Sequence, residues 1–101
     1  MILKNRHKEI LLNIAQHNIQ TPINIWAFGS RVNGDACNGS DLDLIIRTKD
    51  DKPLDFQEFV NFKEGLTESN IPFLVDVLDW NRIPDYFKEN ISKKYEVLKE
   101  L

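Results

Sequence analysis

The stretch that most constrains the fold of this chain is FGSRVNGDACNGSDLDLII, residues 28 to 46. One apolar run, INIWAF, ends directly before Gly29-Ser30, and the next apolar run opens with two aspartates, Asp41 and Asp43. Both runs are short and bounded by turn residues, a pattern that is typical of strands. The stretch therefore predicts two strands, with the Gly-Ser turn at the exit of the first and the aspartates at the entrance of the second.

Hydrophobic spacing predicts the other elements. Helices are expected over residues 4–18, 55–69 and 84–101, and a short helix is expected from Arg31. Strands are expected at 23–28, at 42–47 and in the centre of 71–80. This order predicts an α+β fold in which helices pack on a small three-stranded mixed sheet. Because 101 residues of ordinary hydrophobic content support one modest core, residues 1–101 are expected to form a single domain.

Composition limits the classes of function. Thirteen Lys and Arg against sixteen Asp and Glu give a net charge of -3, which argues against general nucleic-acid binding through bulk charge. The apolar runs are far shorter than the roughly 20 residues of a membrane-spanning helix, so no membrane role is expected. The single cysteine, Cys37, cannot form an internal disulfide, and no leader sequence is expected ahead of the fold. We therefore expect a cytoplasmic protein.

Three aspartates are candidate metal ligands. In a strand, Asp41 and Asp43 point to the same face with Cα atoms about 7 Å apart, where two unit charges repel by about 2 kcal/mol at an effective dielectric constant near 20. A bound divalent cation would reverse that cost. Asp76 interrupts the apolar run FLVDVL, and a carboxylate there must face a site or a solvated edge. Three carboxylates with open coordination positions suit Mg²⁺.

The turn before these aspartates suits a phosphate group. Gly29 allows close approach of the backbone to a ligand, Ser30 adds a hydroxyl donor, and Arg31 adds a charge that pairs with phosphate oxygens. The alternative interpretation is a surface loop whose Ser, Asn, Gly and Asp are ordinary turn formers. The joint spacing of the turn and the carboxylates favours metal-dependent transfer from a nucleoside triphosphate.

The motif G-S-R-x-x-G followed by S-D-x-D resembles the nucleotidyltransferase superfamily that includes DNA polymerase beta. Within it, the chain is most similar to the minimal nucleotidyltransferases found beside HEPN partner proteins. The resemblance implies that Asp41, Asp43 and Asp76 are catalytic and metal-binding residues. It also implies a nucleotide- and phosphate-binding set made of Gly29, Ser30, Arg31, Gly34 and Ser40. Asn33 stands where many members carry a second basic residue.

The resemblance implies a polymerase beta palm-like core and transfer of a nucleotidyl group with two Mg²⁺ ions during catalysis. An acceptor hydroxyl attacks the α-phosphorus, and pyrophosphate leaves. The expected reaction is transfer of AMP from ATP to a hydroxyl of a HEPN-type toxin ribonuclease, with this chain as the antitoxin. Because the chain is short, acceptor binding is expected to need a second protein or an oligomer of the chain itself.

Two other functions stay open at this point. One is nucleotidyl transfer to a small molecule such as an aminoglycoside, which would need an acidic pocket. The other is a non-catalytic nucleotide- or metal-binding module that neutralises its partner by contact.

Several other polar and aromatic residues are assigned structural roles. His7 and His17 lie ten residues apart on one predicted helix, so they cannot form a metal pair, and both are expected to be solvated. Asp79 is expected to be a solvated charge at a strand end. Trp26 and Trp80 are expected to pack in the core or at its rim.

Overall fold

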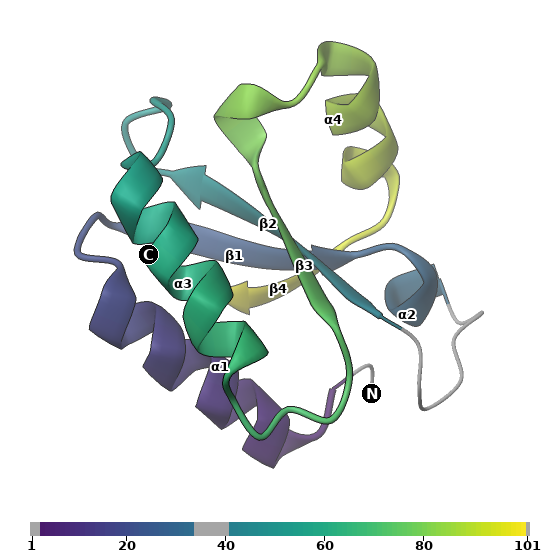
Figure 1. Ribbon diagram of the computed structural model, residues 1–101. Helices are drawn as coiled ribbons and strands as arrows, with labels where there is room; N and C mark the ends of the chain where they lie inside the picture. The colour runs from purple at the N-terminus through teal and green to yellow at the C-terminus, as the bar shows by residue number, and fades with distance from the viewer. Residues whose placement is uncertain (1–2, 34–40, 101) are drawn as a thin grey trace.

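The computed structural model describes residues 3–33 and 41–100, which form one mixed sheet with helices packed on it (Figure 1). In chain order the elements are α1 (Asn5–Asn18), β1 (Ile23–Phe28), α2 (Ser30–Asn33), β2 (Leu42–Thr48), α3 (Phe56–Thr67), β3 (Val75–Asp79), the 3-10 helix η1 (Trp80–Arg82), α4 (Asp85–Lys93) and β4 (Glu96–Lys99). The strand order is β3-β2-β1-β4. The α+β fold expected from the sequence is confirmed. In the two described ranges, each helix is too short or too polar to span a membrane.

The strand pairing determines which strand ends meet at one end of the sheet. β2 runs antiparallel to β1 and parallel to β3, while β4 lies antiparallel on the other edge of β1. A parallel pair requires a crossover connection, which α3 supplies between β2 and β3. As a result, the end of β1 lies beside the beginning of β2, and the beginning of β3 lies on the other side of β2.

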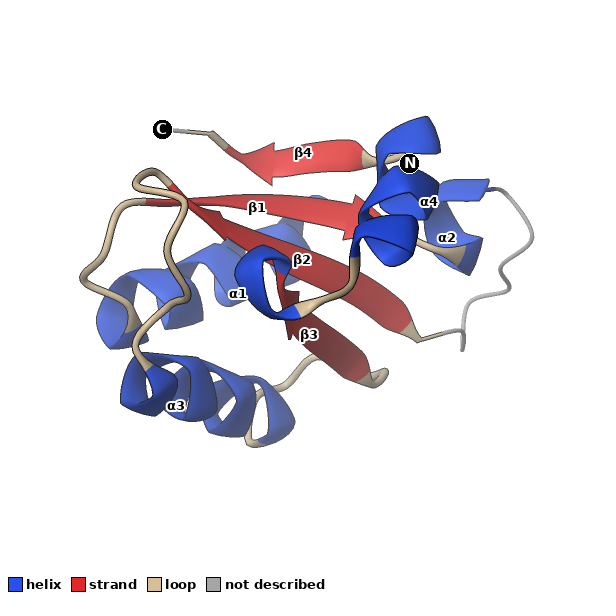
Figure 2. Cartoon of the chain, turned by 90° about the horizontal axis from the view of Figure 1, so that it is seen from above, coloured by secondary structure: helices blue, strands red, loops and turns tan. Residues whose placement is uncertain are grey.

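α1 and α3 lie next to each other and cover one face of the sheet (Figures 1 and 2). Because strand residues alternate between faces, Ile25, Leu44 and Val77 point toward these helices, and all three are buried. They join Leu11 of α1 and Phe62 of α3 in one hydrophobic cluster. Burying each such side chain contributes roughly 1.5–3 kcal/mol. This core fixes the three strands, and so fixes the residues that alternate onto the opposite face.

The opposite face of the sheet carries an aromatic cluster. Trp26 is the cross-strand partner of Ile45, which is fully buried. The Trp26 ring stacks on Tyr95 with centroids 4.1 Å apart and meets Trp80 edge-on at 5.7 Å. The Arg47 guanidinium lies 4.3 Å from the Trp80 ring centroid. Rim packing by the two tryptophans, as expected from the sequence, is confirmed.

The expected three-stranded sheet is wrong, because the sheet has a fourth strand. The helix expected over 84–101 ends at Lys93, and Lys94 is already extended, with φ -158° and ψ 116°. From there the chain runs as β4 along β1, whose edge would otherwise leave its backbone hydrogen-bonding groups unpaired. Leu98 is buried there, although its apolar spacing fits a helix as well as a strand.

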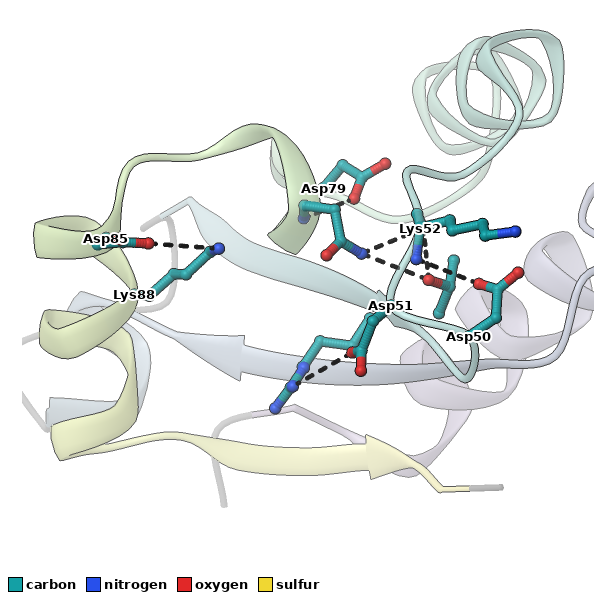
Figure 3. A network of polar contacts seen from close by, with 9 residues as sticks. Asp50, Asp51, Lys52, Asp79, Asp85 and Lys88 are labelled. Carbon is teal, nitrogen blue, oxygen red and sulfur yellow. Dashed lines mark hydrogen bonds and ion pairs between the residues drawn. The ribbon is translucent and has the colours of Figure 1, made fainter.

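Asp79 is a structural residue and not the solvated charge that was expected. The residue is only 3% exposed, and its carboxylate accepts hydrogen bonds from the backbone N–H of Leu54 at 2.8 Å and of Asn81 at 2.9 Å. Arg82 Nε lies 3.6 Å from the same carboxylate. Figure 3 shows Asp79 close to Lys52. The Lys52 carbonyl accepts a hydrogen bond from Asn81 Nδ2 at 3.1 Å, which joins the loop before α3 to η1. Sequence alone does not reveal these backbone donors.

His7 is also buried, contrary to expectation. It is 7% exposed, and its ring meets Phe73 edge-on with centroids 5.5 Å apart. Burial, together with the positive charges of Arg6, Lys4 and Arg31, lowers the pKa of His7 below its usual value of 6.5. His17 is exposed, as expected, and its Nδ1 lies 2.8 Å from the carbonyl oxygen of Asn13.

Candidate active site

Sheet pairing brings two of the three predicted catalytic aspartates together. Asp43 is the second residue of β2 and Asp76 is the second residue of β3, and the two are direct partners in the parallel register. Asp43 is also the antiparallel partner of Phe28, the last residue of β1. Cross-strand partners share a face of the sheet. The two carboxylates therefore lie on the face opposite the main core, at the point where β1 turns.

Asp41 stands just before β2 and is exposed, whereas Asp43 is half-buried. Burial of Asp43, followed by the negative charges of Asp76 and Asp41, raises the pKa of this carboxyl above its usual value of 3.8. Asp41 and Asp76 are thus both near enough to Asp43 to act on its carboxyl electrostatically. The site concentrates negative charge where the strands meet.

The donor chemistry of this cluster fits a hard divalent cation, because carboxylate oxygens are the ligands that Mg²⁺ and similar ions prefer. Within residues 3–33 and 41–100, however, no three or more His, Cys, Asp or Glu side chains are arranged to hold a metal ion. An ion shared by Asp41, Asp43 and Asp76 would therefore require carboxylates to rotate toward it. The backbone register already fixes the Asp43–Asp76 pair.

Gly29 brings the turn after β1 into contact with this acidic pair. Its φ is +85°, a backbone conformation that favours glycine. A Cβ added at Gly29 would lie 2.3 Å from Asp43 Oδ2, which is closer than any real contact. The next residues form the short helix α2, in which the Val32 N–H donates to the Gly29 carbonyl at 3.1 Å. The glycine of the predicted phosphate-binding turn and the central aspartate are therefore nearest neighbours.

Arg31 lies on α2 and is held by an aromatic ring. Its Cζ is 4.0 Å from the centroid of Phe73, in the segment that leads into β3. The same Phe73 ring contacts His7. Cation–π contact of this kind contributes about 0.5–2 kcal/mol and restricts the guanidinium to one region. Sequence reasoning missed Phe73, which carries no motif signal and is identified only by its place beside Arg31.

The remaining predicted site residues are only partly covered by the structure. Ser30 opens α2. Gly34 and Ser40 lie outside the described residues, and so does Cys37.

A pocket of about 430 Å³ opens beside Gly29, between the end of β1 and α4. It is lined by Phe28, Gly29, Phe87, Asn90, Ile91, Lys93 and Lys94. The Phe28 and Phe87 rings meet nearly perpendicularly, with centroids 6.1 Å apart. Figure 2 shows α4 and α2 at the same end of β1. Sequence reasoning missed this pocket, although the spacing of Phe87, Asn90 and Ile91 puts them on one face of α4.

Comparison with known proteins identifies relatives of this chain. Residues 9–101 match the family described as Polymerase beta, Nucleotidyltransferase. A relative from Haemophilus influenzae, the probable protein adenylyltransferase MntA, is 47% identical over 76 residues, which are 75% of this chain and 65% of the relative. The match thus spans slightly less than two thirds of the relative's own length.

Solved structures share the fold. A toxin–antitoxin crystal structure with AMP-PNP aligns with a TM-score of 0.75 at 19% identity, covering 93% of this chain and 73% of that chain. A mutant of the toxin–antitoxin MntA–HpeT aligns with a TM-score of 0.74 at 17% identity and the same coverage. At these identities, the likeness concerns the fold alone.

Proposed function

The chain belongs to the polymerase beta nucleotidyltransferase family, and we propose that it transfers AMP from ATP to a hydroxyl of a partner protein. The observation that carries this proposal is the pairing of Asp43 with Asp76 directly beside Gly29. The resemblance to a probable protein adenylyltransferase supports AMP as the transferred group. The reaction requires the triphosphate and the attacking hydroxyl to be held close together. The glycine turn would bind the triphosphate, and the two carboxylates beside it would act on the hydroxyl.

Nucleotidyltransferases generally use divalent metal ions, and the acidic cluster suits Mg²⁺. Asp41, Asp43 and Asp76 would hold it. When bound, it would offset the charge of the triphosphate and lower the pKa of the acceptor hydroxyl. The raised pKa of Asp43 supports this role, because a site that gathers negative charge gains most from a cation.

Asp76 faces the attacking group in this proposal. It lies on an edge strand and is exposed, so an acceptor hydroxyl is able to approach it from solvent. The hydroxyl oxygen forms a bond to the α-phosphorus while its proton passes to the Asp76 carboxylate. The bond between the α-phosphorus and the bridging oxygen breaks at the same centre, and pyrophosphate leaves with the electron pair.

The leaving pyrophosphate is stabilised on the opposite side of the α-phosphorus. Gly29 gives the phosphates access to the backbone, and Ser30 and Arg31 donate hydrogen bonds to their oxygens. Gly34 and Ser40 continue this set in the proposal. Because Phe73 holds the Arg31 guanidinium, that charge is positioned before the nucleotide arrives.

The proposed acceptor is a HEPN-type toxin, and the proposed role is that of a cytoplasmic antitoxin. The fold neighbours come from toxin–antitoxin complexes, one with AMP-PNP, which supports a nucleotide and a toxin partner. Transfer to an aminoglycoside is not favoured, because Lys93 and Lys94 make the pocket beside Gly29 basic, whereas a polycationic acceptor needs an acidic pocket.

Labelling separates catalysis from simple contact. The chain is incubated with Mg²⁺ and ATP labelled at the α-phosphate, with and without its HEPN-type partner, and wild type is compared with Asp43→Asn. Asp50→Asn is the matched control, because Asp50 lies exposed in the turn after β2. Label on the partner that is lost only in Asp43→Asn supports the proposal. A partner that binds tightly and never takes up label, or equal labelling by Asp43→Asn, overturns it.

A further inference from the structure

Resting on the proposed function, we infer that the acceptor protein docks as an extended, basic segment along the outer edge of β3. β3 is the terminal strand of the sheet, and within residues 3–33 and 41–100 no strand pairs with its outer edge (Figure 2). An edge strand offers backbone N–H and C=O groups to an incoming chain, and strand addition is a recurring way of binding an extended peptide. Asp76, which faces the attacking hydroxyl in the proposed reaction, lies on this strand.

The hydrogen bonding of β3 shows which backbone groups face outward. The Leu42 N–H donates to the Leu74 carbonyl at 2.9 Å, so the backbone groups of Leu74 face β2. Because these groups alternate in direction along a strand, those of Asp76 also face β2, whereas those of Val75 and Val77 face outward. An added strand bonds to these two residues and leaves the pairing of β2 with β3 intact. One of its side chains then lies across from Asp76, with Cβ atoms about 5 Å apart.

The opposite edge of the sheet is too far from the carboxylates. β4 forms that edge, and both β2 and β1 lie between it and β3. With neighbouring strands about 4.8 Å apart, a segment added to β4 stands about 19 Å from the backbone of β3. A hydroxyl delivered there does not reach the Asp43–Asp76 pair. Of the two edges, only that of β3 suits the proposed reaction.

An apolar pocket adjoins this edge. It has a volume of about 420 Å³ and lies between the end of α3 and the start of β3, where Leu66, Leu74 and Val75 are among its lining residues. Leu74 is 70% exposed, so it is available for contact with a partner. Val75 packs against the main core and faces the helices, so the added residue across from it points toward the pocket. We therefore expect the acceptor hydroxyl residue to have an apolar neighbour.

The charges around this edge favour a basic segment. Asp76 is exposed on β3, and Glu64 and Glu68 are exposed near the end of α3. Their four-residue spacing puts the two glutamates on one helical face together with Thr67, which lines the pocket. The C-terminal end of the α3 dipole adds to the negative potential. The Arg31 guanidinium is also close, and it is assigned to the phosphates in the proposed reaction.

Steady-state kinetics with two matched pairs of variants tests this docking mode. Val75→Pro removes one outward N–H at an edge position, where proline is tolerated, and Val75→Ala is its control because it keeps that N–H. Glu64→Gln combined with Glu68→Gln removes the acidic face of α3. Its control is Glu89→Gln combined with Glu96→Gln, which neutralises two exposed carboxylates on α4 and β4. The readouts are KM for the partner protein with α-labelled ATP, and calorimetric binding of a methylene-bridged ATP analogue with Mg²⁺.

We expect Val75→Pro to raise the KM for the partner about threefold to tenfold relative to Val75→Ala, the range for loss of one hydrogen bond. The variant of Glu64 and Glu68 should also raise it, by a factor that shrinks as salt is added. Affinity for the ATP analogue should stay at the wild-type level. An unchanged partner KM in the variant of Glu64 and Glu68, or equal loss of affinity for the analogue, overturns the inference.

Amide hydrogen exchange of the wild-type chain tests the edge directly, and it decides the question if Val75→Pro does not fold. In a complex with the partner and the ATP analogue, the N–H groups of Val75 and Val77 should exchange more slowly than in the free chain. Protection of β4 while Val75 and Val77 still exchange freely overturns the inference. If wild type never labels the partner, the proposed function fails, whereas protection of Val75 and Val77 still establishes docking on β3.

Discussion

Asp43 and Asp76 face each other across the parallel pairing of β2 and β3, so the backbone itself holds two like charges together. Adjacent strands lie about 4.8 Å apart, and two unit charges at about 5 Å repel by about 3 kcal/mol at an effective dielectric constant of 20. Because Asp76 is exposed, solvent screening reduces this to about 1 kcal/mol. Local stability is therefore lowered at the place where the proposed chemistry needs negative charge.

Asp43→Asn should stabilise the metal-free protein at neutral pH. Removing one charge relieves about 1 kcal/mol of repulsion, which corresponds to a rise in Tm of roughly 4–8 °C for a domain of this size. Since the folded-state pKa of Asp43 is raised, the wild-type penalty is present above that pKa and disappears as pH falls toward 3.8. Thermal unfolding at pH 7 and pH 4 measures the difference. A variant less stable than wild type at pH 7 would contradict this account.

Divalent cations should stabilise the wild-type chain through the same carboxylates. Mg²⁺ that binds only the folded state at about 100 times its Kd adds about 2.7 kcal/mol to the free energy of unfolding. We expect EDTA to reverse the increase in Tm, and both Asp43→Asn and Asp76→Asn to abolish it. Asp50→Asn, in the exposed turn after β2, should retain the full response. An equal Mg²⁺ response in all four proteins would place the ion elsewhere.

Local patterns predicted the elements that carry the site. β1, the Gly29 turn and the start of β2 follow directly from short apolar runs with polar ends. From the sequence, the position of Asp76 beside Asp43 was only a hypothesis. Strand order depends on contacts between distant parts of the chain, which local sequence patterns do not reveal. The parallel register of β2 and β3 in the structure makes the two residues direct partners.

Other features were missed because tertiary contacts override local signals. Residues 96–99 fit a helical pattern but pair with the free edge of β1. Asp79 and His7 have polar side chains that normally stay solvated, yet both are buried by elements distant in sequence, the loop before α3 in one case and Phe73 in the other. Such burial depends on partners that are brought together only by the fold.

Gly29→Ala should impair both folding and transfer. The new Cβ would meet Asp43 Oδ2 at 2.3 Å, and alanine is strained at a φ of +85°. We expect a loss of about 2 kcal/mol in the free energy of unfolding. Combining it with Asp43→Gly tests the contact, because removal of the carboxylate should recover part of the loss. Strict additivity in a denaturant series would show that the backbone strain alone is responsible.

Phe73→Leu should weaken use of ATP through Arg31. The substitution keeps apolar packing but removes the ring that lies 4.0 Å from the guanidinium carbon, a contact worth about 0.5–2 kcal/mol. We expect KM for ATP to rise about threefold to tenfold with a smaller change in kcat, while Phe73→Tyr restores wild-type values. Steady-state kinetics with the partner as acceptor measures the split. An unchanged KM with a reduced Tm would make Phe73 merely structural.

His7 should make the fold sensitive to mild acid in the opposite sense to Asp43. Its pKa is lowered in the folded state by burial and by Arg6, Lys4 and Arg31, so the unfolded chain binds the proton more tightly. Stability is therefore expected to fall as pH drops through 6.5 toward the lowered folded-state pKa. His7→Phe, which keeps an aromatic ring beside Phe73, should flatten the pH dependence of Tm between pH 7 and pH 5. His17→Gln, on the exposed side of the same helix, is the control and should retain the wild-type slope. If His7→Phe and wild type lose stability in parallel over that range, another group is responsible for the acid sensitivity.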